Sequence, residues 1–251
     1  MSEDVVLTEQ RGRVLVITLN RPEAMNAVDG ALAAGLATAM ERLDGEPGVT
    51  VGVIAGAGRG FSAGMDLKAF ARGEDVDPFA RFLREGARKP LIAAIEGFAL
   101  AGGLELALAC DLLVAARGAR LGIPEVGVGL FAAGGGLLRL PNRVGHSKAM
   151  EMALTGDPLT AEEAASLGLL ARLTVPGEAL DAALELAERI ARNAPLAVAA
   201  SKELIDAAQR LTAQEFWAFQ QPLKASVFTS SDAAEGPRAF AEKRAPVWSG
   251  T

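Results

Sequence analysis

Two glutamates stand in stretches of sequence where a carboxylate is unusual. Glu105 lies within residues 102–108 (GGLELAL), and Glu125 lies within residues 122–127 (GIPEVG). A carboxylate among apolar neighbours loses hydration, which is costly unless the group has a partner. A glutamate in the first turn of a helix can also simply favour the helix dipole. If the two carboxylates share one dry pocket, they can divide the acid and base steps of a proton-transfer reaction. Their separation in the chain leaves open whether they meet.

Glycines precede Glu105 at the start of the same apolar segment. Gly102 and Gly103 begin a predicted helix that has no Ser, Thr, Asp or Asn side chain to cap it. Glycine is itself tolerated as a cap. Alternatively, the bare N–H groups at the positive end of the helix are left for a ligand oxygen. The glutamate that follows favours the second interpretation.

The glycine-rich loop at residues 58–64 offers two further motifs. Residues 60–64 (GFSAG) match the G-x-S-x-G nucleophile elbow, which would make Ser62 the nucleophile of a serine hydrolase. The base would have to be His146, which lies in a polar stretch typical of a solvated helix start. Residues 58–63 also fit a loose dinucleotide-binding pattern, but no acidic residue ends a strand about 20 residues later. The hydrolase is therefore a minor alternative.

Composition removes several other chemistries. The 251 residues include one cysteine (Cys110), one histidine and no tyrosine, which excludes a disulfide framework, a multi-cysteine zinc site and a histidine-rich metal site. Lys and Arg total 25 against 31 Asp and Glu, a net charge of -6. This balance argues against nucleic acid or a membrane surface as a partner. The amino terminus lacks the features of a secretory signal, so we expect a cytoplasmic protein.

The hydrophobic pattern predicts the elements that must position these residues. Apolar β-branched runs predict strands at residues 14–19, 49–55, 90–95 and 112–115, with a short one near Leu121. Helical spacing predicts helices at residues 30–43 and from about Gly102. From Ser147 onward the pattern is helical, with a capping box at residues 160–163 and a stop at Gly168. We therefore expect an α/β chain with strand–helix alternation over two thirds of its length and a helical tail.

Six segments in order along the chain together resemble one known family, the enoyl-CoA hydratase/isomerase (crotonase) superfamily. They are residues 20–27 (NRPEAMNA), 61–67 (FSAGMDL), 101–105 (AGGLE), 122–125 (GIPE), 154–156 (LTG) and 242–244 (EKR). The resemblance implies a superhelix of repeated ββα units over residues 1–195. It also implies a helical C-terminal region, residues 196–251, that mediates formation of a homotrimer, and such trimers commonly pair into homohexamers.

The same resemblance implies an acyl-CoA thioester substrate and assigns roles to residues. The backbone N–H groups of Met65 and Gly102 would form an oxyanion hole for the thioester carbonyl, and Glu105 and Glu125 would be the catalytic pair. No metal or separate cofactor is implied, because coenzyme A is part of the substrate. Further residues implied to bind the substrate or its CoA are Ala24, Ala63, Gly64, Asp66, Leu67 and Lys243; for Lys243, a plain solvated lysine is the alternative.

Because both glutamates are present, the chain is most similar to the hydratases of the family. We expect addition of water across the C2=C3 bond of a 2-trans-enoyl-CoA to give a 3-hydroxyacyl-CoA, with Glu105 activating the water and Glu125 delivering a proton to C2. An isomerase converting 3-enoyl-CoA to 2-enoyl-CoA through Glu125 is the nearest alternative. A non-catalytic acyl-CoA binder is another, because Ala132 and Ala133 replace the family's usual Pro-Gly pair.

Overall fold

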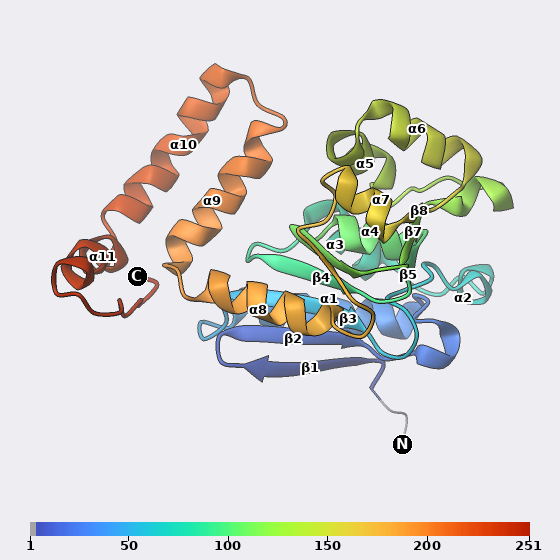
Figure 1. The fold of residues 1–251 in the computed structure, drawn as a ribbon, viewed down its shortest axis with the longest axis horizontal. Coiled ribbons are helices and arrows are strands. Elements are labelled where there is room, and N and C mark those ends of the chain that lie inside the picture. The colour runs from blue at the N-terminus through green and yellow to red at the C-terminus, as the bar shows by residue number, and fades with distance from the viewer. Residues whose placement is uncertain (1–3) are drawn as a thin grey trace.

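Two β-sheets form the framework of the computed structural model, which describes residues 4–251. The larger sheet has six strands in the order β1-β2-β3-β4-β6-β9, antiparallel between β1 and β2 and parallel elsewhere (Figure 1). The smaller sheet has the order β5-β7-β8. The strands are β1 (Val6–Arg11), β2 (Val14–Leu19), β3 (Val51–Gly56), β4 (Leu91–Ile95), β5 (Phe98–Leu100), β6 (Leu112–Ala116), β7 (Arg120–Gly122), β8 (Leu159–Thr160) and β9 (Arg172–Thr174).

Successive turns of chain repeat one ββα pattern, as expected. Strands β4 and β5 lead into α4 (Gly102–Leu108), and strands β6 and β7 lead into the 3-10 helix η2 (Pro124–Val128) and α5 (Gly136–Val144). In each pair the first strand joins the larger sheet and the second joins the smaller one. Since β5 and β7 are parallel neighbours, the segments that follow them, α4 and η2, emerge side by side. This arrangement brings the two candidate glutamates to the same edge.

The central strands are buried on both faces, which explains their continuous apolar runs. In β2, Leu15 and Ile17 face one hydrophobic cluster together with residues of α1 (Gly30–Gly45), while Val14 and Val16 face the other. Helix α8 (Ala179–Ala191) covers that second face. Helix α3 (Asp77–Glu85) packs against α1 on the first face, while η1 (Pro22–Ala24) and α2 (Leu67–Ala71) lie in the connections that follow β2 and β3.

The remaining helices lie at the edge of the sheets or beyond it. They are α6 (His146–Thr155), α7 (Ala161–Ser166), α9 (Pro195–Ala208), α10 (Ala213–Phe228) and α11 (Ser231–Ala241). Helices α9 and α10 form a hairpin that stands away from the sheets (Figure 1). Helix α10 has no buried residue, and Trp217 is 60% exposed. Within residues 4–251, no helix combines the length and apolar character needed to cross a bilayer.

Every strand and helix predicted above is present, and the capping box at Thr160 and Glu163 is confirmed. The uninterrupted helical pattern from Ser147 was wrong, because β8 and β9 lie within it. These are strands of two and three residues, too short to carry a hydrophobic period. Strand β1 was not predicted because it is an edge strand whose side chains are mostly exposed, and it therefore lacks an apolar run.

Candidate active site

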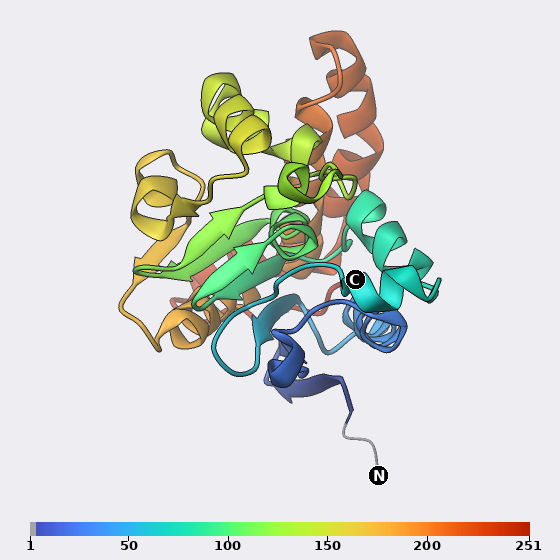
Figure 2. The ribbon, with the colours of Figure 1, turned by 90° about the vertical axis from the view of Figure 1, so that its right-hand side faces the viewer.

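A cavity of about 650 Å³ lies beside the amino-terminal end of α4. Met65, Gly102, Glu105 and Glu125 all line it, so the structure brings together the four residues predicted to do chemistry. Figure 2 shows α2 and α3 in teal to the right of the green strands of the smaller sheet, with the yellow-green helices α5 and α6 above these strands. The rest of the lining is mostly apolar and includes Ala63, Leu67, Phe70, Phe79, Ala80, Leu83, Val128, Leu130, Phe131 and Ala133.

The backbone N–H groups of Met65 and Gly102 are available as a pair of donors. A Cβ on Gly102 would lie 3.6 Å from the Met65 nitrogen, so the two residues are neighbours. The N–H of Val28 donates to the Gly64 carbonyl, and the Val28 carbonyl accepts from the N–H of Asp66. Met65 stands between these two bonded residues, so its own N–H is directed away from Val28. Neither the Met65 nor the Gly102 N–H donates a hydrogen bond to any group of residues 4–251. Two unpaired donors at this spacing are what an oxyanion requires.

A strained residue precedes Gly102. Ala101 has φ +50° and ψ -130°, a conformation that side chains other than glycine rarely adopt. Its N–H donates to the Gly122 carbonyl, and its own carbonyl accepts from the N–H groups of Leu104 and Glu105. The chain therefore reverses sharply after β5, and α4 begins directly beside the Met65 loop. Gly64 in that loop comes so close that a Cβ would lie 2.8 Å from the Gly102 nitrogen.

Glu105 is buried, with hydrogen-bond donors and a positive charge close to its carboxylate. The side chain is 4% exposed, and its Oε1 accepts a hydrogen bond of 2.9 Å from the N–H of Gly136, the first residue of α5. Burial raises the pKa of Glu105, while hydrogen bonds from the N–H groups of Gly136 and Gly134 and the positive charge of Arg139 oppose that rise. These partners favour the ionised form of Glu105, the form that can accept a proton.

Glu125 has a poorer set of partners. Its Oε2 is buried without a hydrogen-bond partner among residues 4–251. Burial raises the pKa of Glu125, and the negative charge of Glu105 raises it further. That second cause also shows that the carboxylates are close enough to interact. Its own backbone N–H is the one donor that lowers the pKa of Glu125, so within residues 4–251 the Glu105 carboxylate has the larger set of stabilising partners.

The other predicted binding residues fall into two groups. Ala63 and Leu67 line the cavity, and the N–H of Ala63 donates to the Met25 carbonyl, which joins this loop to the turn that contains Ala24. The side chain of Asp66 caps α2 and pairs with Arg21, so it holds the loop in shape. Lys243 follows α11, which Figure 1 places at the opposite end of the molecule from α2. A single chain therefore does not bring Lys243 to the cavity.

Sequence reasoning missed one wall of the cavity. Phe79, Ala80 and Leu83 come from α3, a helix that was not predicted. Its signal was available, since Pro78 stands at the start of the helix and apolar residues follow at positions 79, 82 and 83. The hydrogen bonds from Gly134 and Gly136 to Glu105 were also missed, because they join residues about 30 positions apart.

The interpretation of Ser62 as a nucleophile was wrong. Its side chain is fully buried, and its hydroxyl donates to the Asn26 carbonyl at 2.8 Å and accepts from the Gly64 N–H at 3.1 Å. His146 is an exposed residue at the start of α6. Ser62 is therefore a structural residue that joins two loops beside the cavity.

We expect the Ser62→Ala variant to lower the free energy of unfolding by about 1–3 kcal/mol, because a buried N–H and a buried carbonyl lose their partner. Urea denaturation followed by circular dichroism would measure the change. The wild-type protein should show no labelling by a fluorophosphonate probe. Labelling that disappears in Ser62→Ala would restore the hydrolase interpretation.

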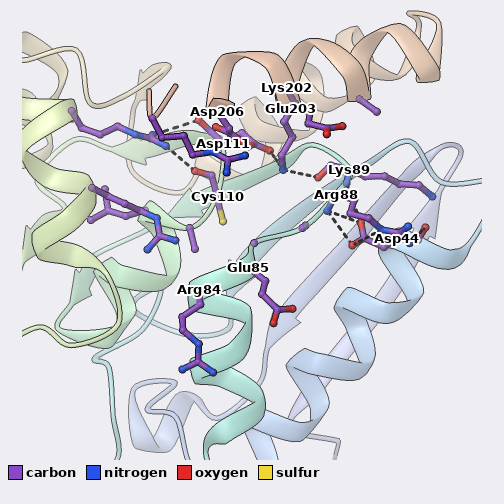
Figure 3. A pocket seen from close by; sticks show the side chains of 18 residues that line it. Asp44, Arg84, Glu85, Arg88, Lys89, Cys110, Asp111, Lys202, Glu203 and Asp206 are labelled. Atoms are coloured by element: carbon purple, nitrogen blue, oxygen red, sulfur yellow. Dashed lines mark hydrogen bonds and ion pairs between the residues drawn. The ribbon is translucent and has the colours of Figure 1, made fainter. Parts of the chain in front are cut away.

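A second cavity, of about 820 Å³, lies at the other end of α4 and is strongly charged (Figure 3). Lys202 of α9 forms an ion pair of 2.8 Å with Asp111 there, which attaches α9 to the sheet. Cys110 is buried in its wall and donates to the Leu106 carbonyl, and burial raises the pKa of its thiol. A thiol in that state is unreactive, as expected from the sequence.

The sequence and fold of the chain are similar to those of known proteins. A family model described as enoyl-CoA hydratase/isomerase matches residues 9–251. The crystal structure of an enoyl-CoA hydratase from Mycobacterium tuberculosis superposes with a TM-score of 0.96 at 55% identity, covering 99% of this chain and 100% of that one.

Two curated relatives are similar over nearly their whole length. A probable enoyl-CoA hydratase from Rhizobium meliloti is 40% identical over 250 residues, 97% of each chain. A carnitinyl-CoA dehydratase from Salmonella typhi is 42% identical over 264 aligned positions, which cover all of both chains.

Proposed function

The chain belongs to the enoyl-CoA hydratase/isomerase family and is an enzyme of this type, and we propose that it hydrates 2-trans-enoyl-CoA thioesters to 3-hydroxyacyl-CoA. One observation carries the proposal: buried Glu105 and half-buried Glu125, which have unequal partners, share a cavity with two backbone donors that are unpaired within residues 4–251. Each group has a task in hydration, and the reaction needs no cofactor beyond the coenzyme A of the substrate.

In the proposed mechanism, the thioester oxygen accepts hydrogen bonds from the N–H groups of Met65 and Gly102. These donors stabilise the negative charge that develops on that oxygen as the enolate forms. Water gives a proton to Glu105 while its oxygen bonds to C3, and Glu125 gives a proton to C2. The product gains H at C2 and OH at C3. One proton returned from Glu105 to Glu125 restores the starting state.

The isomerase alternative needs only a proton moved between C2 and C4, a task for which one carboxylate suffices. The hydrogen bonds that hold Glu105 in the same cavity favour hydration, which uses both. The non-catalytic alternative rested on Ala132 and Ala133. Gly134 and Gly136, just after them, still hold Glu105, so the replaced pair leaves the base in position.

Initial rates over a series of 2-enoyl-CoA thioesters, followed by loss of the conjugated thioester absorbance, test the proposal. Carnitinyl-CoA belongs in the panel because one relative is named for it. Among residues 4–251, the two glutamates are the only charged side chains that line the cavity, which favours an uncharged apolar acyl group. Absence of turnover with every thioester, despite measurable binding, would contradict hydration and support the non-catalytic alternative.

We also propose that the chain works as a homotrimer or homohexamer. The exposed aromatic residues of α10, which has no buried residue in a single chain, support assembly. A neighbouring copy is then the route by which Lys243 can approach CoA.

The pH dependence of kcat/KM is expected to be bell-shaped, because Glu105 must be ionised and Glu125 protonated. Activity rises with pH as Glu105 loses its proton and falls as Glu125 loses its own. Burial raises the pKa of both groups, so both limbs should lie above the usual range for glutamate. The two limbs report the coupled pair. Initial rates over a pH series would measure them, and a profile flat through the region above the normal glutamate pKa would contradict this assignment.

A further inference from the structure

Arg139 links two segments that meet behind Glu105. Its Nη1 donates to the Gly134 carbonyl at 3.3 Å, and its Nη2 donates to the Leu83 carbonyl at the end of α3. The residue lies in the first turns of α5 and is half-buried. One guanidinium therefore fixes the turn at residues 134–136 against α3. A lysine, with a single point of charge, would not reproduce this two-carbonyl contact.

The turn that Arg139 fixes is the one that holds Glu105. The N–H groups of Gly134 and Gly136 both donate to the carboxylate. A Cβ on Gly134 would lie 2.7 Å from Glu105 Oε2, and a Cβ on Gly135, where φ is +100°, would lie 2.2 Å from Arg139 Nη1. The glycines are thus packed between carboxylate on one side and guanidinium on the other, with no room for a side chain.

We propose, on the basis of the hydratase function above, that Arg139 is a positioning residue that keeps the turn at residues 134–136 in place so that its amides aim the Glu105 carboxylate at the water. Arg139 does not line the acyl-CoA cavity, so it acts through the turn and through its charge. Losing it would leave Glu105 buried with weaker and less ordered donors.

The positive charge of Arg139 determines in which direction the pKa of Glu105 changes when Arg139 is removed. The charged groups that influence Glu105 are Arg139, which lowers its pKa, and Glu125, whose own pKa is raised by Glu105. Those that influence Arg139 are Arg143, Glu105, Asp206 and Cys110. Removing Arg139 therefore raises the pKa of Glu105. Since Glu105 must be ionised to act, the acidic limb of the pH profile moves to higher pH.

The charged cavity of Figure 3 makes a chemical rescue possible. Arg139 lines that cavity of about 820 Å³, whereas Gly134 of the turn lines the acyl-CoA cavity. Shortening Arg139 to alanine opens a space that joins the charged cavity, through which a guanidinium ion can enter from solvent. The ion would replace the missing group without competing with the acyl-CoA.

The experiment compares Arg139→Ala and Arg139→Lys with Arg143→Ala as the matched control. Arg143 lies one turn further along α5 in the same cavity, and donates to the carbonyls of Cys110 and Asp111. For Arg139→Ala we expect kcat on a 2-enoyl-CoA to fall by roughly ten- to a hundred-fold, part of what acid–base catalysis supplies, with KM little changed. The acidic limb should move to higher pH, and guanidinium far below denaturing concentrations should restore part of kcat. Arg139→Lys retains the positive charge but not the contact with two carbonyls. Its acidic limb should therefore stay near the wild-type pH while its kcat still falls.

In Arg143→Ala, the acidic limb of the pH profile should stay at its wild-type position, and guanidinium should not raise kcat. If Arg139→Ala loses thermal stability while kcat per folded molecule and the acidic limb stay unchanged, Arg139 is only structural and the proposal is wrong. Carbon NMR titration of the Glu105 carboxyl, assigned with Glu105→Gln, gives a readout that does not depend on turnover. A wild-type protein without hydratase activity would contradict the proposed function, whereas an unshifted Glu105 titration in Arg139→Ala would contradict this inference.

Discussion

Replacement of Glu125 by glutamine is expected to lower kcat for hydration by about 10²- to 10⁴-fold, the range that a general acid contributes. Glutamine keeps the shape of the side chain but has no acidic proton to give to C2. Oε2 of Glu125 has no hydrogen-bond partner among residues 4–251, so no contact to that oxygen is broken. Binding of a saturated acyl-CoA, measured by calorimetry, should remain within a few-fold of wild type because the apolar lining and the backbone donors are unchanged.

Stability separates loss of the acid from loss of the fold. Burial raises the pKa of Glu125, so the folded protein binds a proton there more tightly than the unfolded chain. This group therefore lowers stability as pH rises through the unfolded and then the folded pKa. Glu125→Gln removes that penalty, and its free energy of unfolding at neutral pH should equal or exceed that of wild type. A variant less active but also clearly less stable would point to a structural role.

Glu105→Gln is the companion that distinguishes hydratase from isomerase. Its amide oxygen can still accept from Gly136, but its amide nitrogen cannot accept from Gly134 and cannot take a proton from water. Hydration should fall as steeply as in Glu125→Gln. Conversion of 3-enoyl-CoA to 2-enoyl-CoA that survives in Glu105→Gln but not in Glu125→Gln would favour the isomerase alternative.

The sequence was enough to find the glutamate pair because local composition marks a misplaced charge. Glu105 and Glu125 stand among apolar residues, and a buried carboxylate is unusual wherever it occurs. Gly102 was found in the same way, as a helix start with no capping side chain. Met65 has no local signal in the sequence and was predicted only from the resemblance. The relevant property is its backbone N–H, which is left free by the hydrogen bonds between Val28 and the residues on either side of Met65.

What the sequence could not supply depends on contacts between distant segments. Residues 60–64 match a catalytic motif of five residues. Ser62 is nevertheless buried, and its hydroxyl donates to the Asn26 carbonyl, so its role is structural. Arg139 looks like an ordinary helical arginine until the carbonyls of Gly134 and Leu83, the latter 56 residues away, are placed beside it. The segment that contains Lys243, just after α11, has its position fixed by how α9 and α10 leave the sheet, which no local pattern encodes.

Deletion of one oxyanion donor is the second large effect that we expect, and Gly102 allows it cleanly. Gly102 is the first residue of α4, the position where a helix accepts proline most readily, because the N–H there has no partner within the helix. Gly102→Pro removes that N–H and places a ring carbon where the donated hydrogen was. By comparison with other oxyanion holes, the barrier should rise by about 2.7–4 kcal/mol, which lowers kcat by about 10²- to 10³-fold.

Gly102→Ala is the matched control for that deletion. A Cβ at this position would lie 3.6 Å or more from its nearest neighbours, an ordinary contact distance, and the N–H is retained. Its kcat should therefore stay within a few-fold of wild type, and the helical circular dichroism and thermal unfolding of both variants should resemble those of wild type. If proline and alanine reduced kcat equally, bulk at Gly102 would be the cause and its N–H would not be a donor in the reaction. If alanine is tolerated and proline is not, the difference between them measures the cost of replacing the Gly102 N–H, the hydrogen-bond donor from α4 to the enolate oxygen, by a ring carbon.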